Sequence, residues 1–155
     1  MESIVKELTI EASPERVWNA ITQQEEIAGW WTNDLSVKPE VGSLAELRFN
    51  QGTLIIQFEI AELDKDKKVS WITRQGPSTG HWVGTSVTWQ LTPIENSTKL
   101  VFNHDGFAQA GRRFENTRSW WEHFLVSLKS YLETGKGNPG SPLESRNADS
   151  LKITH

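Results

Sequence analysis

The chain has 155 residues, a net charge of −4, 36% hydrophobic residues and no cysteine. This length suits one domain, and the lack of cysteine excludes disulfides, thiol nucleophiles and thiolate metal sites. The Lys and Arg residues form no basic stripe, which argues against nucleic acid as a partner. No apolar segment reaches the roughly 18 residues of a membrane span, and the first residues lack the pattern of a signal peptide. We therefore expect a cytoplasmic protein without a membrane span.

The N-terminal part of the chain predicts one strand and two short helices. Residues 3–11 alternate in the manner of a strand that carries apolar side chains on both faces. Ser13 and Pro14 then favour a helix start, because serine is a good N-cap and proline fits the first helical position. A second short helix is expected over residues 23–28.

The middle of the chain, from residue 45 to residue 104, predicts a run of strands. Apolar and polar side chains alternate there, and short turns separate the alternating segments. Consecutive strands with short connections indicate an antiparallel meander. Residues 33–42, which precede these strands, are expected to form a loop because they contain proline and glycine.

Three tryptophans lie at ambiguous positions. Trp30 and Trp31 are adjacent and must point in different directions, so at least one is expected to pack under the short helices. Trp82 falls on the strand face opposite to Val83 and Trp89. We expect it at the surface, either as an isolated aromatic residue or in a patch that is used for dimerisation.

Residues 112–134 carry the strongest helix pattern of the chain. Their apolar side chains recur at spacings of three and four, which makes one wide stripe, and Gly135 favours a C-terminal cap. A helix of this length spans about 34 Å and can cross a whole sheet. Residues 136–155 are rich in Gly, Pro, Ser and Asn, and we expect a largely disordered tail after a domain of residues 1–135. The fold class is therefore α+β, with a curved antiparallel sheet of about six strands wrapped around a long C-terminal helix.

Three stretches together carry a family resemblance. They are residues 10–21 (IEASPERVWNAI), the pair Trp30-Trp31, and residues 103–107 (NHDGF) followed by Trp120-Trp121. The pattern resembles the START-like, birch-pollen-allergen-like (SRPBCC) superfamily. Within it, the chain is similar to bacterial single-domain proteins that resemble the C-terminal domain of the activator of the heat-shock-protein-90 ATPase. The resemblance covers roughly residues 3–135.

The resemblance implies a helix-grip fold with a ligand cavity between the sheet and the long helix. In the family a His-x-Gly-Phe element ends the last strand, and here it is His104, Gly106 and Phe107. The family's usual glycine before the tryptophan of the long helix is replaced, since Ser119 and Trp120 precede Trp121. This bulkier sequence is expected to shrink or reshape the cavity.

Nine residues are expected to line the cavity: Trp31, Phe58, Trp71, Trp89, Phe102, His104, Phe107, Trp121 and Phe124. Most of them would equally serve an ordinary core. His104 is the polar candidate, either as an anchor for a ligand or, in the favoured interpretation, as a hydrogen-bonding residue that fixes the turn at residues 105–106. Arg74 and His81 could form a polar rim at the cavity mouth, although solvated loop residues are the favoured interpretation. We identify no catalytic, cofactor-binding or metal-binding residues.

The leading hypothesis for function is non-enzymatic binding of a small hydrophobic molecule, lipid-like or aromatic, in this cavity. One alternative is a stress-related co-chaperone that acts on the ATPase of a heat-shock chaperone. Another is a cyclase or hydrolase that uses His104 as acid or base. The expected partners are thus a small hydrophobic molecule, a chaperone or a second copy of the chain, and no cofactor is expected.

Overall fold

The computed structural model describes residues 2–75, 82–107 and 111–140. In chain order its elements are β1 (Glu2–Ile10), α1 (Pro14–Thr22), α2 (Gln24–Ile27), β2 (Leu35–Ser36), β3 (Leu44–Phe49), the 3₁₀ turn η1 (Asn50–Gly52), β4 (Leu54–Asp64), β5 (Lys68–Gln75), β6 (Ser86–Ile94), β7 (Ser97–Phe107) and α3 (Arg112–Thr134). Within these residues, no helix is both long enough and apolar enough to cross a membrane.

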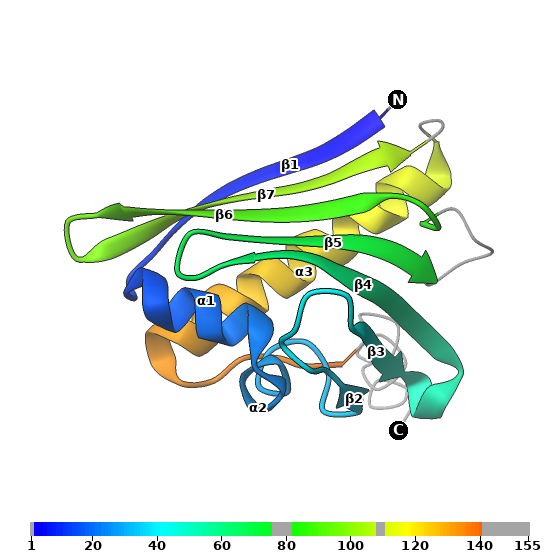
Figure 1. Ribbon diagram of the computed structural model, residues 1–155, viewed down its shortest axis with the longest axis horizontal. Coiled ribbons are helices and arrows are strands. Elements are labelled where there is room, and N and C mark those ends of the chain that lie inside the picture. Colours follow the sequence, from blue (N-terminus) through cyan, green and yellow to red (C-terminus); the bar gives the residue numbers. More distant parts are fainter. Residues whose placement is uncertain (1, 76–81, 108–110, 141–155) are drawn as a thin grey trace, which may run out of the picture.

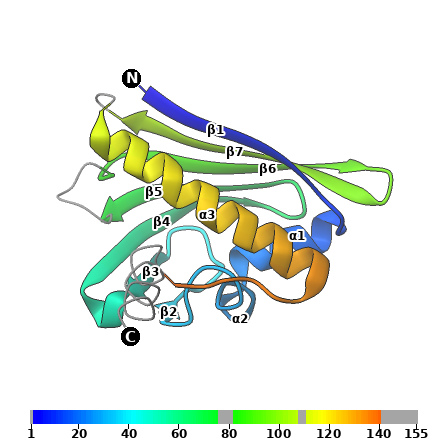
Figure 2. The ribbon, with the colours of Figure 1, turned by 180° about the vertical axis from the view of Figure 1, so that it is seen from behind.

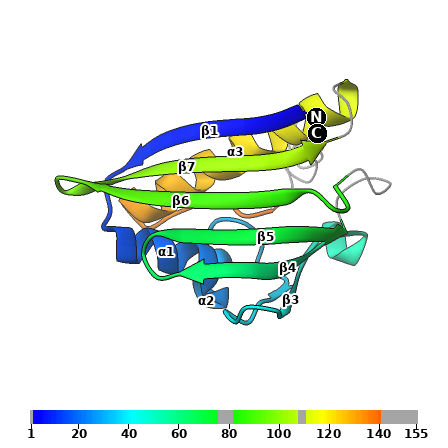
Figure 3. The same ribbon diagram turned by 45° about the horizontal axis from the view of Figure 1, so that its top comes forward.

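The strands form one antiparallel sheet in the order β1-β7-β6-β5-β4-β3-β2, and α3 crosses one face of it (Figures 1 and 2). The first strand pairs with the last, so β1 lies at one edge of the sheet. Figure 3 shows the strands side by side, with the long helix behind them. The predicted α+β helix-grip fold is confirmed, including the two short helices after the first strand. The sheet has seven strands because the short β2 lies within the segment that was expected to be a loop.

Local sequence signals explain the helix ends. The hydroxyl of Ser13 accepts a hydrogen bond from the backbone amide of Arg16 at 3.3 Å, and Pro14 is the first helical residue of α1. Gly135 ends α3 with a φ of 87°, a left-handed conformation that glycine adopts without steric cost. Ser13 and Pro14 thus set the start of α1, and Gly135 sets the end of α3.

Side chains alternate between the two faces of the sheet, as the sequence pattern predicts. In β7 the residues Leu100, Phe102 and His104 are buried on the side of α3, whereas Val101 and Asn103 are only partly buried on the other side. The core lies between this inner face and the apolar stripe of α3.

After α3 the chain reverses direction, and residues 136–140, called the strap below, run back beside the helix toward β2 and β3 (Figure 2). The amide of Gly140 donates to the carbonyl of Trp31 at 2.8 Å, and the hydroxyl of Ser130 donates to the carbonyl of Lys136 at 2.7 Å. The strap is the described part of the segment that was expected to be a tail, and residues 141–155 lie outside the described residues.

Candidate functional site

The nine residues expected to line a cavity come together between the sheet and α3. Each of them has at most 2% of its surface exposed. They come from the segment after α2, from β4 to β7 and from α3. Three tryptophans that were not included in that set join them: Trp30, Trp82 and Trp120. These twelve residues are called the aromatic cluster below.

Stacked rings fill much of the space in which a ligand was expected. The ring of Trp31 lies nearly parallel to that of Trp71, with centroids 5.6 Å apart. Trp71 stacks in turn on Phe58 at 3.9 Å. Such separations leave no room for a further ring between these partners. A ligand at this level would therefore require side chains to move.

Trp121 of α3 stands at the centre of the aromatic cluster and is fully buried. Its ring centroid lies 4.5 Å from that of Phe102 and 5.3 Å from that of Trp31. It also stacks on Trp82, with centroids 5.9 Å apart and an angle of 15° between the planes. One side chain thus connects the helix to β7, to the segment after α2 and to the turn before β6.

His104 joins α3 to the sheet by hydrogen bonds at both ring nitrogens. The indole N–H of Trp121 donates to Nδ1 at 3.0 Å, and Nε2 lies 2.7 Å from the hydroxyl of Thr85. Because an indole N–H can only donate, Nδ1 must accept, which places the proton on Nε2 of a neutral imidazole. The hydroxyl of Thr85 then accepts from Nε2 and donates to the backbone carbonyl of Trp82. The described contacts of His104 therefore link the helix to residues 82–85.

The expectation that Trp82 lies at the surface is wrong. Trp82 has 1% of its surface exposed, whereas Val83 has 55%. The strand pattern does not apply because β6 begins only at Ser86, and Gly84 has a φ of 82° in the preceding turn. The side chain of Trp82 therefore turns inward, and its indole N–H donates to the hydroxyl of Thr117 at 2.9 Å. A turn signal at Gly84 was the only hint of this in the sequence.

Three buried indole N–H groups have no hydrogen-bond partner among the described residues. They belong to Trp31, Trp89 and Trp120. The indole of Trp30, by contrast, donates to the carbonyl of Ala20 at 2.7 Å. Most buried donors in proteins are satisfied, so an unpaired one marks a place where a water molecule or a ligand could bind. Two of the three, Trp31 and Trp89, belong to the residues that were expected to line the cavity.

Arg74 and His81 were considered as a rim of the cavity. Arg74 lies near the end of β5 and is paired with Glu59 of the neighbouring β4 at 2.7 Å. Since Glu59 is partly exposed and Arg74 is exposed, both on the outer side of the sheet, Arg74 lies away from the aromatic cluster. His81 lies outside the described residues.

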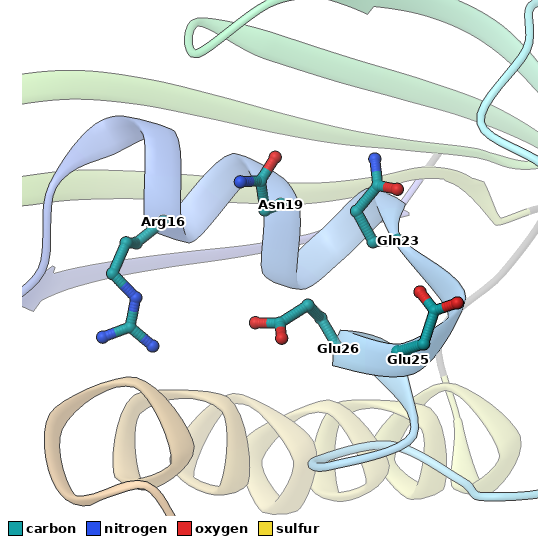
Figure 4. A pocket seen from close by; sticks show the side chains of 5 residues that line it. All are labelled: Arg16, Asn19, Gln23, Glu25 and Glu26. Atoms are coloured by element: carbon teal, nitrogen blue, oxygen red, sulfur yellow. The ribbon is translucent and has the colours of Figure 1, made fainter.

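Two surface pockets lie outside the aromatic cluster, and none of the cluster's residues lines either of them. One, of about 400 Å³, lies beside α1 and α2, and Figure 4 shows its polar lining: Arg16, Asn19, Gln23, Glu25 and Glu26. The other, of about 320 Å³, is called the β3 pocket below. It is lined by Thr32, Asn33, Asp34, Arg48, Phe49, Gln51, Pro139 and Gly140.

The β3 pocket combines a charged rim with an aromatic wall. Arg48 pairs with Asp34 at 2.8 Å and also with Glu46. Hydrogen bonds from Gln57 and then from Arg48 lower the pKa of the Glu46 carboxyl. The ring of Phe49 forms the wall and lies 5.1 Å from that of Trp120. Phe49 therefore lines the pocket and also contacts the aromatic cluster.

His123 of α3 lies beside the strap and provides a prediction about pH. Burial lowers the pKa of His123, and the nearby backbone of Asn138 and Gly140 opposes this only in part. The unfolded chain therefore binds more protons than the folded one below a pH of about 6.5, so stability falls as the pH decreases through this range. Because the ring is partly exposed, we expect His123 to contribute less than about 1 kcal/mol to the loss between pH 7.5 and pH 5.5.

Urea unfolding at the two pH values measures this loss, and it should be smaller in a His123→Gln variant. The Glu46 and Glu133 carboxyls, whose pKa values are lowered, titrate in a more acidic range and do not interfere. An equal loss in the variant and in the parent protein would contradict the prediction.

Comparison with known proteins agrees with this architecture. The family described as "Activator of Hsp90 ATPase homolog 1-like protein" matches residues 11–133. The solution structure of the Aha1 dimer from Colwellia psychrerythraea is 36% identical, covers 88% of this chain and all of its own, and superimposes with a TM-score of 0.79.

Two further solved structures share the fold. Protein MLL2253 from Mesorhizobium loti is 26% identical over 84% of this chain and 96% of its own, with a TM-score of 0.75. Protein SSP2350 from Staphylococcus saprophyticus is 20% identical over 90% and 98%, with a TM-score of 0.74. No match was found among curated proteins. On its family match and its 36% identity to the Colwellia protein, the chain belongs to the family of proteins similar to activator of Hsp90 ATPase homolog 1.

Proposed function

We propose that this protein binds a small hydrophobic molecule, aromatic or lipid-like and bearing hydrogen-bond acceptors, between the sheet and α3, without catalysing a reaction. The observation that carries the proposal is that the buried indole N–H groups of Trp31 and Trp89 have no hydrogen-bond partner within the part of the chain that the structure describes. An acceptor on a ligand would satisfy them, and the surrounding rings supply apolar surface. Burial of such surface favours binding by about 25 cal/mol per Å² before ordering costs are subtracted.

The packing of the aromatic cluster restricts the kind of ligand. Because Trp31, Phe58 and Trp71 already stack on one another, a ligand must displace or rotate at least one ring. A flat molecule that replaces one stacked ring by another recovers most of the lost contact. The proposal therefore favours planar aromatic ligands with carbonyl or hydroxyl groups over bulky saturated ones.

The ligand hypothesis is tested with a panel of lipids, flavonoids and polyketides, by tryptophan fluorescence and by thermal melting. A ligand should change the fluorescence and raise the melting temperature. A Trp89→Phe variant keeps a ring but loses the N–H, and we expect about tenfold weaker binding from the lost hydrogen bond. A Trp18→Phe variant, which changes a tryptophan outside the aromatic cluster, controls for the altered fluorescence. If no member of the panel changes either signal, the proposal is wrong.

Catalysis by His104 receives less support from the geometry. An acid or base needs a ring nitrogen that can reach a substrate, and both nitrogens of His104 contact protein groups. Using either nitrogen would break a buried hydrogen bond. We therefore prefer a binding function to a cyclase or hydrolase.

A protein-interaction function is the second candidate, and the family match favours it. The chain is similar to activators of a chaperone ATPase, and the Colwellia relative is described as a dimer. This function predicts that the chain dimerises, or that it binds its host's heat-shock chaperone and changes the ATPase rate. Sedimentation and ATPase assays test the two possibilities. An absence of binding at tens of micromolar would exclude the chaperone function.

A further inference from the structure

We propose that the strap, residues 136–140, is a displaceable closure that controls the entry of small molecules to the aromatic cluster from the side of the β3 pocket. The proposal rests on the proposed function for its biological purpose. The opening of the strap, and the solvent access that follows from it, can be measured without any ligand.

Backbone groups of the strap bond to side-chain hydroxyls of α3 and to the backbone of Trp31. The amide of Gly140 donates to the carbonyl of Trp31 at 2.8 Å, and the amide of Asn138 donates to the hydroxyl of Ser127 at 2.6 Å. That hydroxyl donates in turn to the carbonyl of Trp30 at 2.7 Å. Ser127 is therefore a bridge between the strap and the segment that carries the two tryptophans.

The strap contributes no large apolar side chain to the core. Its sequence from position 136 is Lys-Gly-Asn-Pro-Gly, and these residues are exposed or only partly buried. Segments that few buried apolar contacts hold are the ones that open locally at low free energy. The strap also follows Gly135, the left-handed residue that ends α3. A segment of this kind can detach while the helix and the sheet remain folded.

The strap covers part of the β3 pocket, so its opening bears on access to the aromatic cluster. Pro139 and Gly140 form part of the wall of the β3 pocket, which Phe49 also lines. Behind that ring lie Trp120 and Phe124, with centroids 5.1 and 5.9 Å from it. Removing the strap therefore widens a pocket of about 320 Å³ whose lining residue Phe49 contacts the aromatic cluster.

Several buried polar atoms without a hydrogen-bond partner among the described residues lie around Phe124. The indole N–H of Trp31 and of Trp120 and the Nε2 atom of His123 are buried without a hydrogen-bond partner among the described residues. Trp31 and Trp120 both contact the ring of Phe124, and so does His123. We expect water or a ligand that enters after the strap opens to form hydrogen bonds with these atoms.

The packing at Gly137 provides a direct way to open the strap. A β-carbon at this position would lie 2.4 Å from the carbonyl oxygen of Gly29 and 2.9 Å from the α-carbon of Trp30. Both contacts involve backbone atoms, which cannot yield as the end of a flexible side chain does. A Gly137→Ala variant must therefore shift the strap away from this segment.

The test measures opening and access separately in the full chain. Hydrogen exchange reports the opening of the strap at the amides of Asn138 and Gly140. Acrylamide quenching of tryptophan fluorescence reports access to the aromatic cluster. In Gly137→Ala we expect exchange at these amides to accelerate by about tenfold or more. We also expect quenching to increase while the far-ultraviolet circular dichroism is unchanged.

Two further variants make the result specific. Ser127→Ala removes the bridging hydroxyl and should change both signals in the same direction as Gly137→Ala. Asn138→Ala is the matched control, because it keeps the backbone amide that donates to Ser127, and it should change neither signal.

The proposal is overturned if exchange does not accelerate in Gly137→Ala and Ser127→Ala, or if it accelerates without an increase in quenching. Neither measurement depends on a ligand. A failed ligand screen would therefore overturn the proposed function while leaving the result on the strap intact.

Discussion

Replacing Trp121 with alanine is expected to lower the free energy of unfolding by about 3–5 kcal/mol, the range for truncating a buried tryptophan. Trp121 is fully buried, and its ring contacts those of Trp31, Trp82 and Phe102. Its removal leaves a cavity that the surrounding rings cannot close without giving up their own stacking. Urea unfolding monitored by circular dichroism measures the loss.

Val126→Ala is the matched control on the same helix. Val126 has 67% of its surface exposed, so its truncation should change the free energy of unfolding by no more than about 0.5 kcal/mol. A loss in Trp121→Ala that is as small as this control would show that Trp121 does not support the core.

The Trp121→Ala variant can also show whether there is open space between the sheet and α3. A buried apolar cavity left by truncation can take up a small aromatic molecule. Added indole should therefore raise the melting temperature of Trp121→Ala and leave that of the parent protein unchanged. An equal rise in the parent protein would contradict this expectation and would show that space for a ring already exists beside Trp121.

The features that were predictable from the sequence are those with local causes. The bounds of α3 agree with the prediction because its apolar stripe and its glycine cap both lie in one continuous segment of the sequence. β2 was missed because two residues cannot display an alternating pattern. It is defined by its pairing with residues 46 and 47 of β3, which are distant in the sequence.

The packing of side chains between the sheet and α3 depends on contacts that no local sequence pattern reveals. Trp82 was assigned to the wrong side because its position follows from a turn, whereas the prediction assumed a continuous strand. The hydrogen bonds of His104 join residues that are 17 and 19 positions away, and they depend on the register that places His104 opposite Val87. The sequence indicated that aromatic side chains face inward. Whether they leave space is decided by their rotamers, which depend on every neighbouring ring.

Replacing His104 with leucine is expected to lower the free energy of unfolding by about 2–4 kcal/mol. Leucine occupies a similar place but cannot accept from Trp121 or donate to Thr85, and a buried donor or acceptor that loses its partner costs about 1–3 kcal/mol. Thr85 retains its bond to the carbonyl of Trp82, so most of the loss should come from the indole of Trp121. Asn103→Ala, on the opposite face of the same strand, is the control and should stay within about 0.5 kcal/mol.

The sign of the change in the free energy of unfolding in His104→Leu distinguishes a ligand anchor from a residue that joins the helix to the sheet. A residue kept only to anchor a ligand commonly limits stability, so its replacement by an apolar side chain would leave the protein equally stable or more stable while abolishing binding. A residue that joins the helix to the sheet gives the opposite result. A double-mutant cycle with Trp121→Phe, which removes the indole N–H but keeps a ring, should show a coupling of about 0.5–3 kcal/mol. A coupling near zero would mean that the bond between His104 and Trp121 does not stabilise the fold, and His104 would again be available as a ligand anchor.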